Sequence, residues 1–216
     1  MAMDAEQSGK HSITSTVLRA LRKEICASAY ADGQFITEAE VSQKYRVSKT
    51  PAREALTILC EEKLLCKIPR KGYMVKKLSL KELCKLYQFR NILERATVEH
   101  AVRYADEEDL RHLDVLASAQ VDTSHPEWIQ EYHRGNSAFH IGLAALTRNN
   151  YLIDALRGVL NILQRDLIED MKYIGVEKTL GEHRRIVEAV RRRDLTEALS
   201  ITSQQINIIE RKEHMS

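Results

Sequence analysis

Four polar side chains occupy positions where the helical repeat of the sequence otherwise places apolar residues. Asn136 and His140 are four residues apart on one such stripe, while His183 and Gln205 lie on two others. Imidazole and amide groups inside a helical bundle can bind a metal ion, satisfy one another together with water, or hydrogen-bond directly to an organic ligand. The sequence leaves these three alternatives open.

A second group of chemically active residues lies in the stretch RVSKTPAREAL, residues 46–56. Lys49, Thr50 and Arg53 fall on one face of the helix that this stretch predicts, and apolar residues fall on the other. Pro51 costs no hydrogen bond, because the first N–H groups of a helix have no partner within it. These N–H groups and the two cations suit a DNA phosphate, and an arginine can also reach guanine in the major groove.

A turn about 20 residues further on adds to this basic surface. The segment IPRKGY places two cations beside a glycine between two β-prone runs, which predicts a hairpin. A basic helix followed by a basic hairpin is typical of a DNA-binding winged helix. The predicted DNA-binding residues are Ser48, Lys49, Thr50, Arg53, Arg70, Lys71 and Gly72.

The charge is concentrated in one region of the 216 residues. The whole chain has a net charge of +2, but residues 44–76 contain 9 Lys and Arg against 3 Asp and Glu. Residues 77–216 contain 20 against 22, which argues against a non-specific nucleoid protein that is basic throughout. No signal peptide or membrane span is indicated, so a cytoplasmic protein without membrane contact is expected. The spacing of the four cysteines favours buried, reduced thiols.

The predicted elements form two domains of a mainly α fold. Residues 1–11 are expected to be a flexible N-terminus. Residues 12–77 have the order helix, helix, helix, hairpin, which predicts a winged helix-turn-helix, and Thr37 with Glu40 forms a capping box at the second helix. From residue 78 to 216 the pattern predicts an all-α six-helix bundle with helices over residues 79–105, 106–122, 126–147, 150–174, 179–193 and 194–212, in which Pro126 suits a first turn.

The run GQFITEAEVSQKYRVSKTPAREALTILCEEKLLCKIPRKGYMVKKLS resembles the winged helix of GntR-family transcriptional regulators. The second domain is similar to the FCD effector-binding domain of the FadR subfamily, through RNILERATVEHA, NSAFHIGLAALTRNNYL and EHRRIVEAVRRRD. One position departs from the family. Ala39 stands where some members have an arginine that contacts DNA.

The resemblance also implies an effector site. In FCD domains, Asp, His, His and His chelate a divalent metal such as zinc that helps to hold a small carboxylate. Here the matching residues are Asn136, His140, His183 and Gln205, so one carboxylate and one imidazole are replaced by amides. Such a set is a poor cage for zinc, and His140 and His183 are its remaining strong ligands.

Arg90 is the fifth residue of the predicted effector site. It lies on the apolar stripe of the first helix of this domain, four residues before Glu94. Two interpretations remain, an i,i+4 ion pair that fixes the helix or a clamp for an effector carboxylate, and the ion pair is favoured because buried arginines are usually paired.

The sequence therefore predicts a ligand-responsive regulator of transcription, with repression expected from family habit. Its expected partners are double-stranded operator DNA, a small organic acid effector and a second copy of the chain in a homodimer. The alternative is a helical metal-dependent enzyme that uses His140 and His183. No nucleophile motif or metalloprotease motif accompanies these histidines, so a protein without enzymatic activity is expected.

Overall fold

The computed structural model describes residues 2–125 and 128–206, with side chains except those of residues 2–12 and 168–174. The chain divides into two compact units, Met1–Leu78 and Ser79–Ser216. The boundary lies within one residue of the one expected from the sequence. Among the described residues, no helix is long and apolar enough to cross a membrane.

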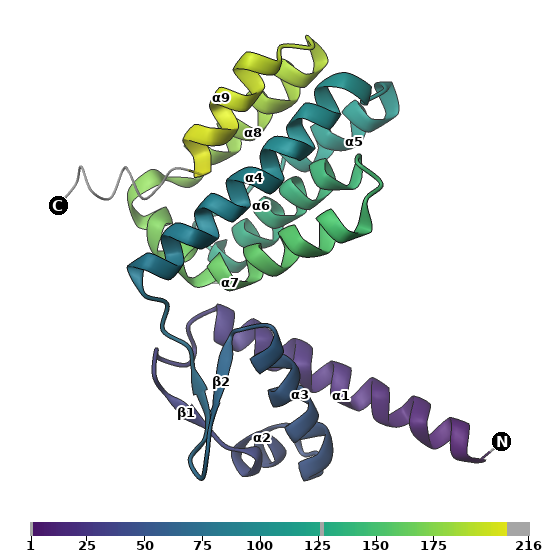
Figure 1. Cartoon of the computed structure of the whole chain (residues 1–216), viewed down its shortest axis with the longest axis vertical. Helices are drawn as coiled ribbons and strands as arrows, with labels where there is room; N and C mark the ends of the chain where they lie inside the picture. The colour runs from purple at the N-terminus through teal and green to yellow at the C-terminus, as the bar shows by residue number, and fades with distance from the viewer. Residues whose placement is uncertain (1, 126–127, 207–216) are drawn as a thin grey trace. The chain divides into compact units, whose positions relative to one another are not determined.

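The N-terminal unit is a winged helix-turn-helix (Figure 1). Its helices are α1 (Ala2–Cys26), α2 (Glu38–Tyr45) and α3 (Lys49–Glu61), and its strands are β1 (Phe35–Ile36), β2 (Leu65–Ile68) and β3 (Gly72–Val75). The strands form an antiparallel sheet in the order β1-β3-β2. Side chains from all three helices and the sheet form one apolar core, which includes Leu21, Val41, Leu56 and Tyr73.

Two features of this unit differ from the sequence prediction. The first helix begins at Ala2 rather than Ser12, so the expected flexible segment, residues 1–11, is helical from residue 2 onwards. The hairpin also has a third strand, because Phe35 and Ile36 pair with Met74 and Tyr73. A two-residue strand has no periodicity of its own from which it could be predicted.

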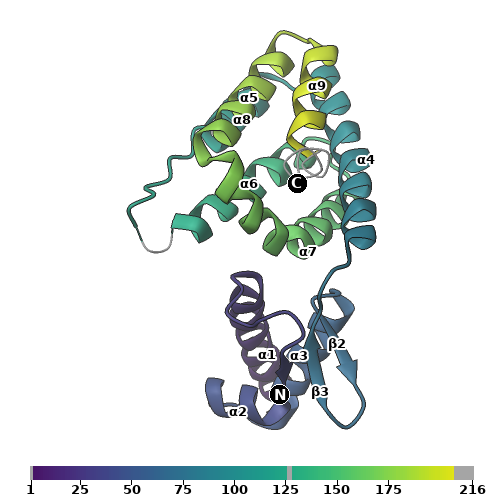
Figure 2. The same cartoon turned by 90° about the vertical axis from the view of Figure 1, so that its left-hand side faces the viewer.

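The C-terminal unit contains six helices among its described residues (Figures 1 and 2). They are α4 (Leu80–Tyr104), α5 (Glu107–Ala117), α6 (Trp128–Ala145), α7 (Asn150–Ile174), α8 (Val176–Arg191) and α9 (Leu195–Ile206). Helix α4 packs against α9 and α7, and α8 packs against α9. The predicted mainly α fold with a six-helix second domain is confirmed, whereas Pro126 and residues 207–212 of the predicted helices lie outside the described residues.

Capping boxes begin helix α2 of the N-terminal unit and helices α4 and α5 of the C-terminal unit. The hydroxyl of Thr37 accepts from the backbone N–H of Glu40, and the Glu40 carboxylate accepts from the N–H of Thr37. Reciprocal bonds of the same kind join Ser79 with Glu82 before α4, and Asp106 with Asp109 before α5. Each box satisfies backbone donors that the first helical turn leaves unpaired, which fixes where the helix begins.

The cysteines differ in part from the expectation. All four are thiols that form no disulfide, but only Cys26 is buried, while Cys60, Cys66 and Cys84 are half-buried. Burial is the largest cause of the raised pKa of the Cys60 thiol.

Candidate nucleic-acid interface and effector pocket

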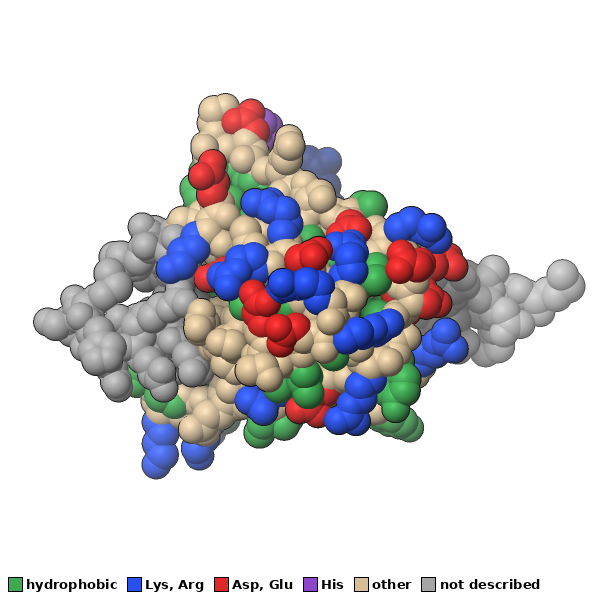
Figure 3. Space-filling view, turned by 90° about the horizontal axis from the view of Figure 1, so that it is seen from above, with side chains coloured by type: hydrophobic (Ala, Val, Ile, Leu, Met, Phe, Trp, Pro, Cys, Tyr) green, Lys and Arg blue, Asp and Glu red, His purple; other side chains and the backbone are tan. Residues whose placement is uncertain are grey.

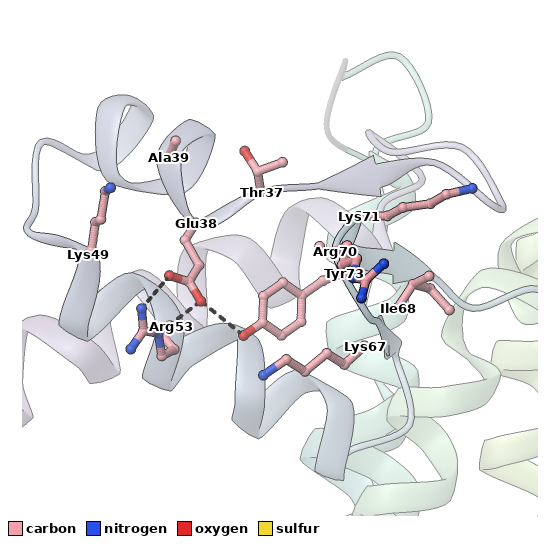
Figure 4. Close-up of a pocket in the computed structure, with 11 residues that line it drawn as sticks. Thr37, Glu38, Ala39, Lys49, Arg53, Lys67, Ile68, Arg70, Lys71 and Tyr73 are labelled. Atoms are coloured by element: carbon pink, nitrogen blue, oxygen red, sulfur yellow. Dashed lines mark hydrogen bonds and ion pairs between the residues drawn. The ribbon is translucent and has the colours of Figure 1, made fainter.

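A groove of about 400 Å³ runs between α3 and the wing, which is the hairpin of β2 and β3 (Figure 4). Five basic side chains and one acidic side chain line it, so its net charge is strongly positive. The lining residues are Thr37, Glu38, Ala39, Lys49, Arg53, Lys67, Ile68, Arg70, Lys71, Gly72 and Tyr73. A concave basic surface beside a helix N-terminus attracts a polyanion.

The N-terminus of α3 supplies the first part of this surface. Ser48 is the N-cap residue, with extended backbone, and its side chain makes no capping hydrogen bond. Ser48, Lys49 and Thr50 are all exposed, so the hydroxyls of Ser48 and Thr50 are accessible from solvent. Pro51 is the third residue of the helix. A backbone N–H at this position would have no partner within the helix, so the proline costs no hydrogen bond. Exposed hydroxyls and N–H groups at this end can donate to a phosphate.

Arg53 is held by a carboxylate from the neighbouring helix. Its Nε and Nη2 donate to Oε1 and Oε2 of Glu38, each at 2.9 Å. The Tyr73 hydroxyl lies 3.4 Å from the same Oε1 (Figure 4). The hydrogen bond from Arg53 is the largest cause of the lowered pKa of Glu38. The Arg53 side chain is 61% exposed, so it remains accessible to DNA while the fork fixes its orientation.

The wing depends on a glycine. Gly72 has a φ of +108°, and a Cβ on it would lie 2.8 Å from the carbonyl oxygen of Ile36. Only glycine avoids both the strained backbone and this close approach. Arg70 at the turn has a φ of +64°, and the Lys71 ammonium lies 6.0 Å from the centre of the Phe35 ring.

The structure brings together most of the residues predicted to contact DNA. Those that line the groove are Lys49, Arg53, Arg70, Lys71 and Gly72, whereas Ser48 and Thr50 lie at the exposed start of α3 outside its lining. The sequence prediction missed Glu38, Lys67 and Tyr73. Lys67 and Tyr73 are paired directly across β2 and β3. The alternation of side chains between the two faces of a strand could have indicated them.

Buried charges form a network in the C-terminal unit. Arg90 Nε donates to Glu94 Oε1 at 2.6 Å, and Nη2 of the same guanidinium lies 3.1 Å from His140 Nε2. His140 Nδ1 lies 2.8 Å from Glu94 Oε2. Each of the three side chains is at most 2% exposed. Burial acts to raise the pKa of Glu94, but the charge of Arg90 and the contact with His140 outweigh it and lower this pKa to about 2.

His183 lies beside this network, and Gln205 is buried on α9, which packs against α4 and α8. The His183 ring stacks on Phe139, with centroids 4.0 Å apart, and meets the His140 ring edge-on at 5.2 Å. Neither nitrogen of His183 and neither polar atom of the Gln205 amide has a hydrogen-bond partner among the described residues. Burial is the first cause that lowers the pKa of His183 well below its usual value, so the ring is neutral.

The donor set does not fit the divalent metal that the family resemblance implies. Two of its four members, Asn136 and Gln205, are neutral amides, which are weak ligands for zinc. His140 Nε2, the nitrogen that Glu94 leaves for a ligand, lies against a guanidinium that would repel a cation. Among the described residues, no three His, Cys, Asp or Glu side chains are arranged to hold a metal ion.

The outer surface of the C-terminal unit differs from the groove in its charge. The face in Figure 3 shows Lys and Arg side chains interspersed with Asp and Glu side chains. Arg191 pairs with Asp114 and Glu188 at 2.7 Å, and Arg192 pairs with Glu197. A surface of mixed sign gives no sustained attraction to a polyanion.

Comparison with known proteins agrees with this division of roles. Residues 13–75 match the family of bacterial regulatory proteins called the gntR family, and residues 85–207 match the FCD domain. The HTH-type transcriptional regulator YdhC of Bacillus subtilis is 30% identical over 178 residues, which cover 81% of this chain and 79% of that protein. The gluconate operon transcriptional repressor of Bacillus licheniformis is 24% identical, over 81% of this chain and 74% of the repressor.

Solved structures support the same fold. A transcriptional regulator from Rhodococcus sp. RHA1 aligns with a TM-score of 0.76 at 21% identity, covering 93% of this chain and 97% of the other. McbR/YncC of E. coli aligns with a TM-score of 0.73 at 17% identity, covering 94% and 99%. None of these similarities supports the alternative of a metal-dependent enzyme. With a GntR winged helix followed by an FCD domain, the chain belongs to the GntR family of transcriptional regulators.

Proposed function

We propose that this transcriptional regulator binds double-stranded operator DNA through the groove between α3 and the wing. The observation that carries the proposal is the convergence of Lys49, Arg53, Arg70 and Lys71 on one concave surface at the N-terminus of α3. In this arrangement α3 enters the major groove, where Arg53 reads a guanine, while Lys49 and the hydroxyls of Ser48 and Thr50 bind phosphates. Arg70 and Lys71 of the wing contact the adjacent backbone or minor groove.

The regulator acts as a homodimer on a palindromic operator, in the cytoplasm where such DNA is found. One reading head rarely supplies enough discrimination, and helix-turn-helix proteins usually place two heads about one helical turn apart. Phe89 and Ile92, which are 44% and 66% exposed, lie three residues apart on α4 and so on one face of it. A second copy that covers this face would bury both side chains. Light scattering should then give a dimer for the wild type and a monomer for Phe89→Glu/Ile92→Glu.

The effector binds in the C-terminal unit, at the buried polar residues Arg90, Asn136, His140, His183 and Gln205. Its binding changes helix packing, hence the spacing of the two reading heads and the affinity for the operator, which makes the protein a ligand-released repressor. The small organic acid expected from the resemblance would need Arg90 to give up part of its contact with Glu94 and His140.

The test is a fluorescence-anisotropy titration of the full chain with DNA from upstream of its own gene and with scrambled DNA of equal length. At physiological salt, a specific complex should form with a Kd on the order of 10 nM, and scrambled DNA should bind roughly 1,000-fold more weakly. Equal affinity for the two DNAs would reject the proposal of sequence-specific binding.

A further inference from the structure

We propose that the buried polar site of His140 and His183, with Gln205 on the neighbouring helix α9, binds an uncharged, hydrogen-bonding ligand directly, without a divalent metal ion. The inference rests on the effector-binding role proposed above and names the class of ligand. It disagrees with the metal-bound carboxylate that the family resemblance implies.

The charges of the buried polar site leave no place for an additional one. Arg90 and Glu94 are 2% and 1% exposed and form an ion pair, so their opposite charges already balance. Asn136 and Gln205 add no charge, and the fully buried His183 ring has no hydrogen-bond partner among the described residues that would stabilise a charge on it. A carboxylate entering this site without a metal would be a buried charge that nothing compensates, which is unfavourable.

Both ring nitrogens of His140 lie against charged side chains. In metal centres a carboxylate commonly holds one imidazole nitrogen and thereby turns the other toward the ion. Glu94 holds His140 Nδ1 in this way, but Arg90 Nη2 lies 3.1 Å from His140 Nε2. The nitrogen that would bind a metal therefore accepts a hydrogen bond from a cation.

His183 and Gln205 have polar atoms without hydrogen-bond partners among the described residues. The His183 ring has two nitrogens that can donate or accept hydrogen bonds, and the Gln205 amide has an acceptor oxygen and two donor hydrogens. Both side chains are buried, at 0% and 6% exposure, and their polar atoms lack hydrogen-bond partners among the described residues. Buried groups of this kind need partners. A ligand that both donates and accepts, through hydroxyl or carboxamide groups, satisfies them without adding charge.

The metal part is tested by calorimetric titration of the chelator-treated full chain with nickel and manganese chlorides. The wild type and His183→Phe, which keeps a ring against Phe139 but has no nitrogen, should give the same isotherm. A wild-type site that is lost in His183→Phe would overturn the proposal. Asn136→Asp/Gln205→His should gain one site per chain, and a folded double variant that gains none would contradict the role given to the amides.

The ligand part is tested by thermal shift with matched pairs of probes, threitol against tartrate and glutaramide against glutarate, at equal concentrations. At least one uncharged member should raise the Tm of the wild type, and this shift should be absent in His183→Phe and in Gln205→Met. Stabilisation by the acids alone, or by no uncharged probe, would overturn the ligand class. Specific operator binding by the wild type in the anisotropy assay is independent of these results, so a wrong ligand class is distinguishable from a wrong proposed function.

Discussion

The Glu38 carboxylate holds the Arg53 guanidinium in a two-bond fork, with both N···O distances at 2.9 Å. The pair joins α2 to α3 inside the groove proposed to bind DNA (Figure 4). An exposed ion pair of this kind contributes little to stability. The pair instead orients the Arg53 side chain. A guanidinium that is already held in one orientation loses less conformational freedom when it binds a base.

Glu38→Gln should therefore separate specificity from affinity. Removing a negative charge from the groove should strengthen binding to scrambled DNA, while the less firmly held Arg53 should reduce the preference for the operator by roughly ten-fold. Anisotropy titrations with both DNAs measure the two effects. The control is Glu61→Gln, an exposed acid on α3, the helix of Arg53, but outside the groove. Unchanged specificity in Glu38→Gln would show that the fork does not position Arg53.

The wing should depend on the close approach at Gly72 more than on its backbone conformation alone. Gly33 also has a positive φ, +76°, but a Cβ there would have no atom within 4 Å. Gly33→Ala thus measures backbone strain, and Gly72→Ala measures strain plus the contact with Ile36. Calorimetric unfolding should show that Gly72→Ala loses at least about 1 kcal/mol more stability than Gly33→Ala does. Gly72→Ala should also bind the operator more weakly. Equal losses in the two variants would argue against the contact.

Breaking the buried pair in α4 should cost far more than breaking a surface pair. Glu94→Gln leaves the Arg90 charge buried without its partner, so urea unfolding should show a loss of about 3–5 kcal/mol. The double variant Arg90→Met/Glu94→Leu, which removes both charges, should recover most of it. Asp154→Asn, at the exposed pair with Arg157, should cost less than about 1 kcal/mol. A Glu94→Gln effect as small as that of Asp154→Asn would contradict the network.

Acid should destabilise the C-terminal unit through a buried histidine. Burial lowers the pKa of His133 to about 4, whereas the unfolded side chain titrates near its ordinary value of 6.5. The unfolded state thus binds more protons between these values, so stability is complete above pH 6.5 and falls as the pH drops toward 4. Between pH 7 and 5 the loss should be about 2 kcal/mol.

His133→Phe should remove this part of the pH dependence, while the contribution of His183, which has the same sign, should remain. Urea unfolding at several pH values measures the slopes. The exposed His112→Asn should leave the wild-type slope unchanged. An unaltered slope in His133→Phe would refute the assignment.

Features set by neighbouring residues could be predicted from the sequence, and features set by distant residues could not. The capping boxes at Thr37 and Ser79 join residues three apart, and the pair of Arg90 with Glu94 joins residues four apart on one helix. Both follow from helical geometry. By contrast, β1 exists only because of a strand almost forty residues away.

The candidate sites show the same limit. The exposed cations of α3 and the wing could be chosen from residue type and spacing. The fork from Glu38 to Arg53 and the contact of Arg90 with His140 each join two helices, and no periodicity specifies which side chains meet across such an interface. The two amides were visible in the sequence. By contrast, only the packing of α4 against α6 shows that the Arg90 guanidinium lies against His140 Nε2.

The most direct test of the proposed interface is the ratio of operator to scrambled-DNA affinity for single variants of the groove. Arg53→Ala should lower operator affinity roughly ten- to hundred-fold and weaken scrambled-DNA binding much less, by the loss of one positive charge. Lys49→Ala should weaken both and reduce the salt dependence by about one phosphate contact, while Lys178→Ala, exposed on α8, should change neither. Wild-type operator preference in Arg53→Ala would contradict the account, because α3 would then not read the DNA through this residue.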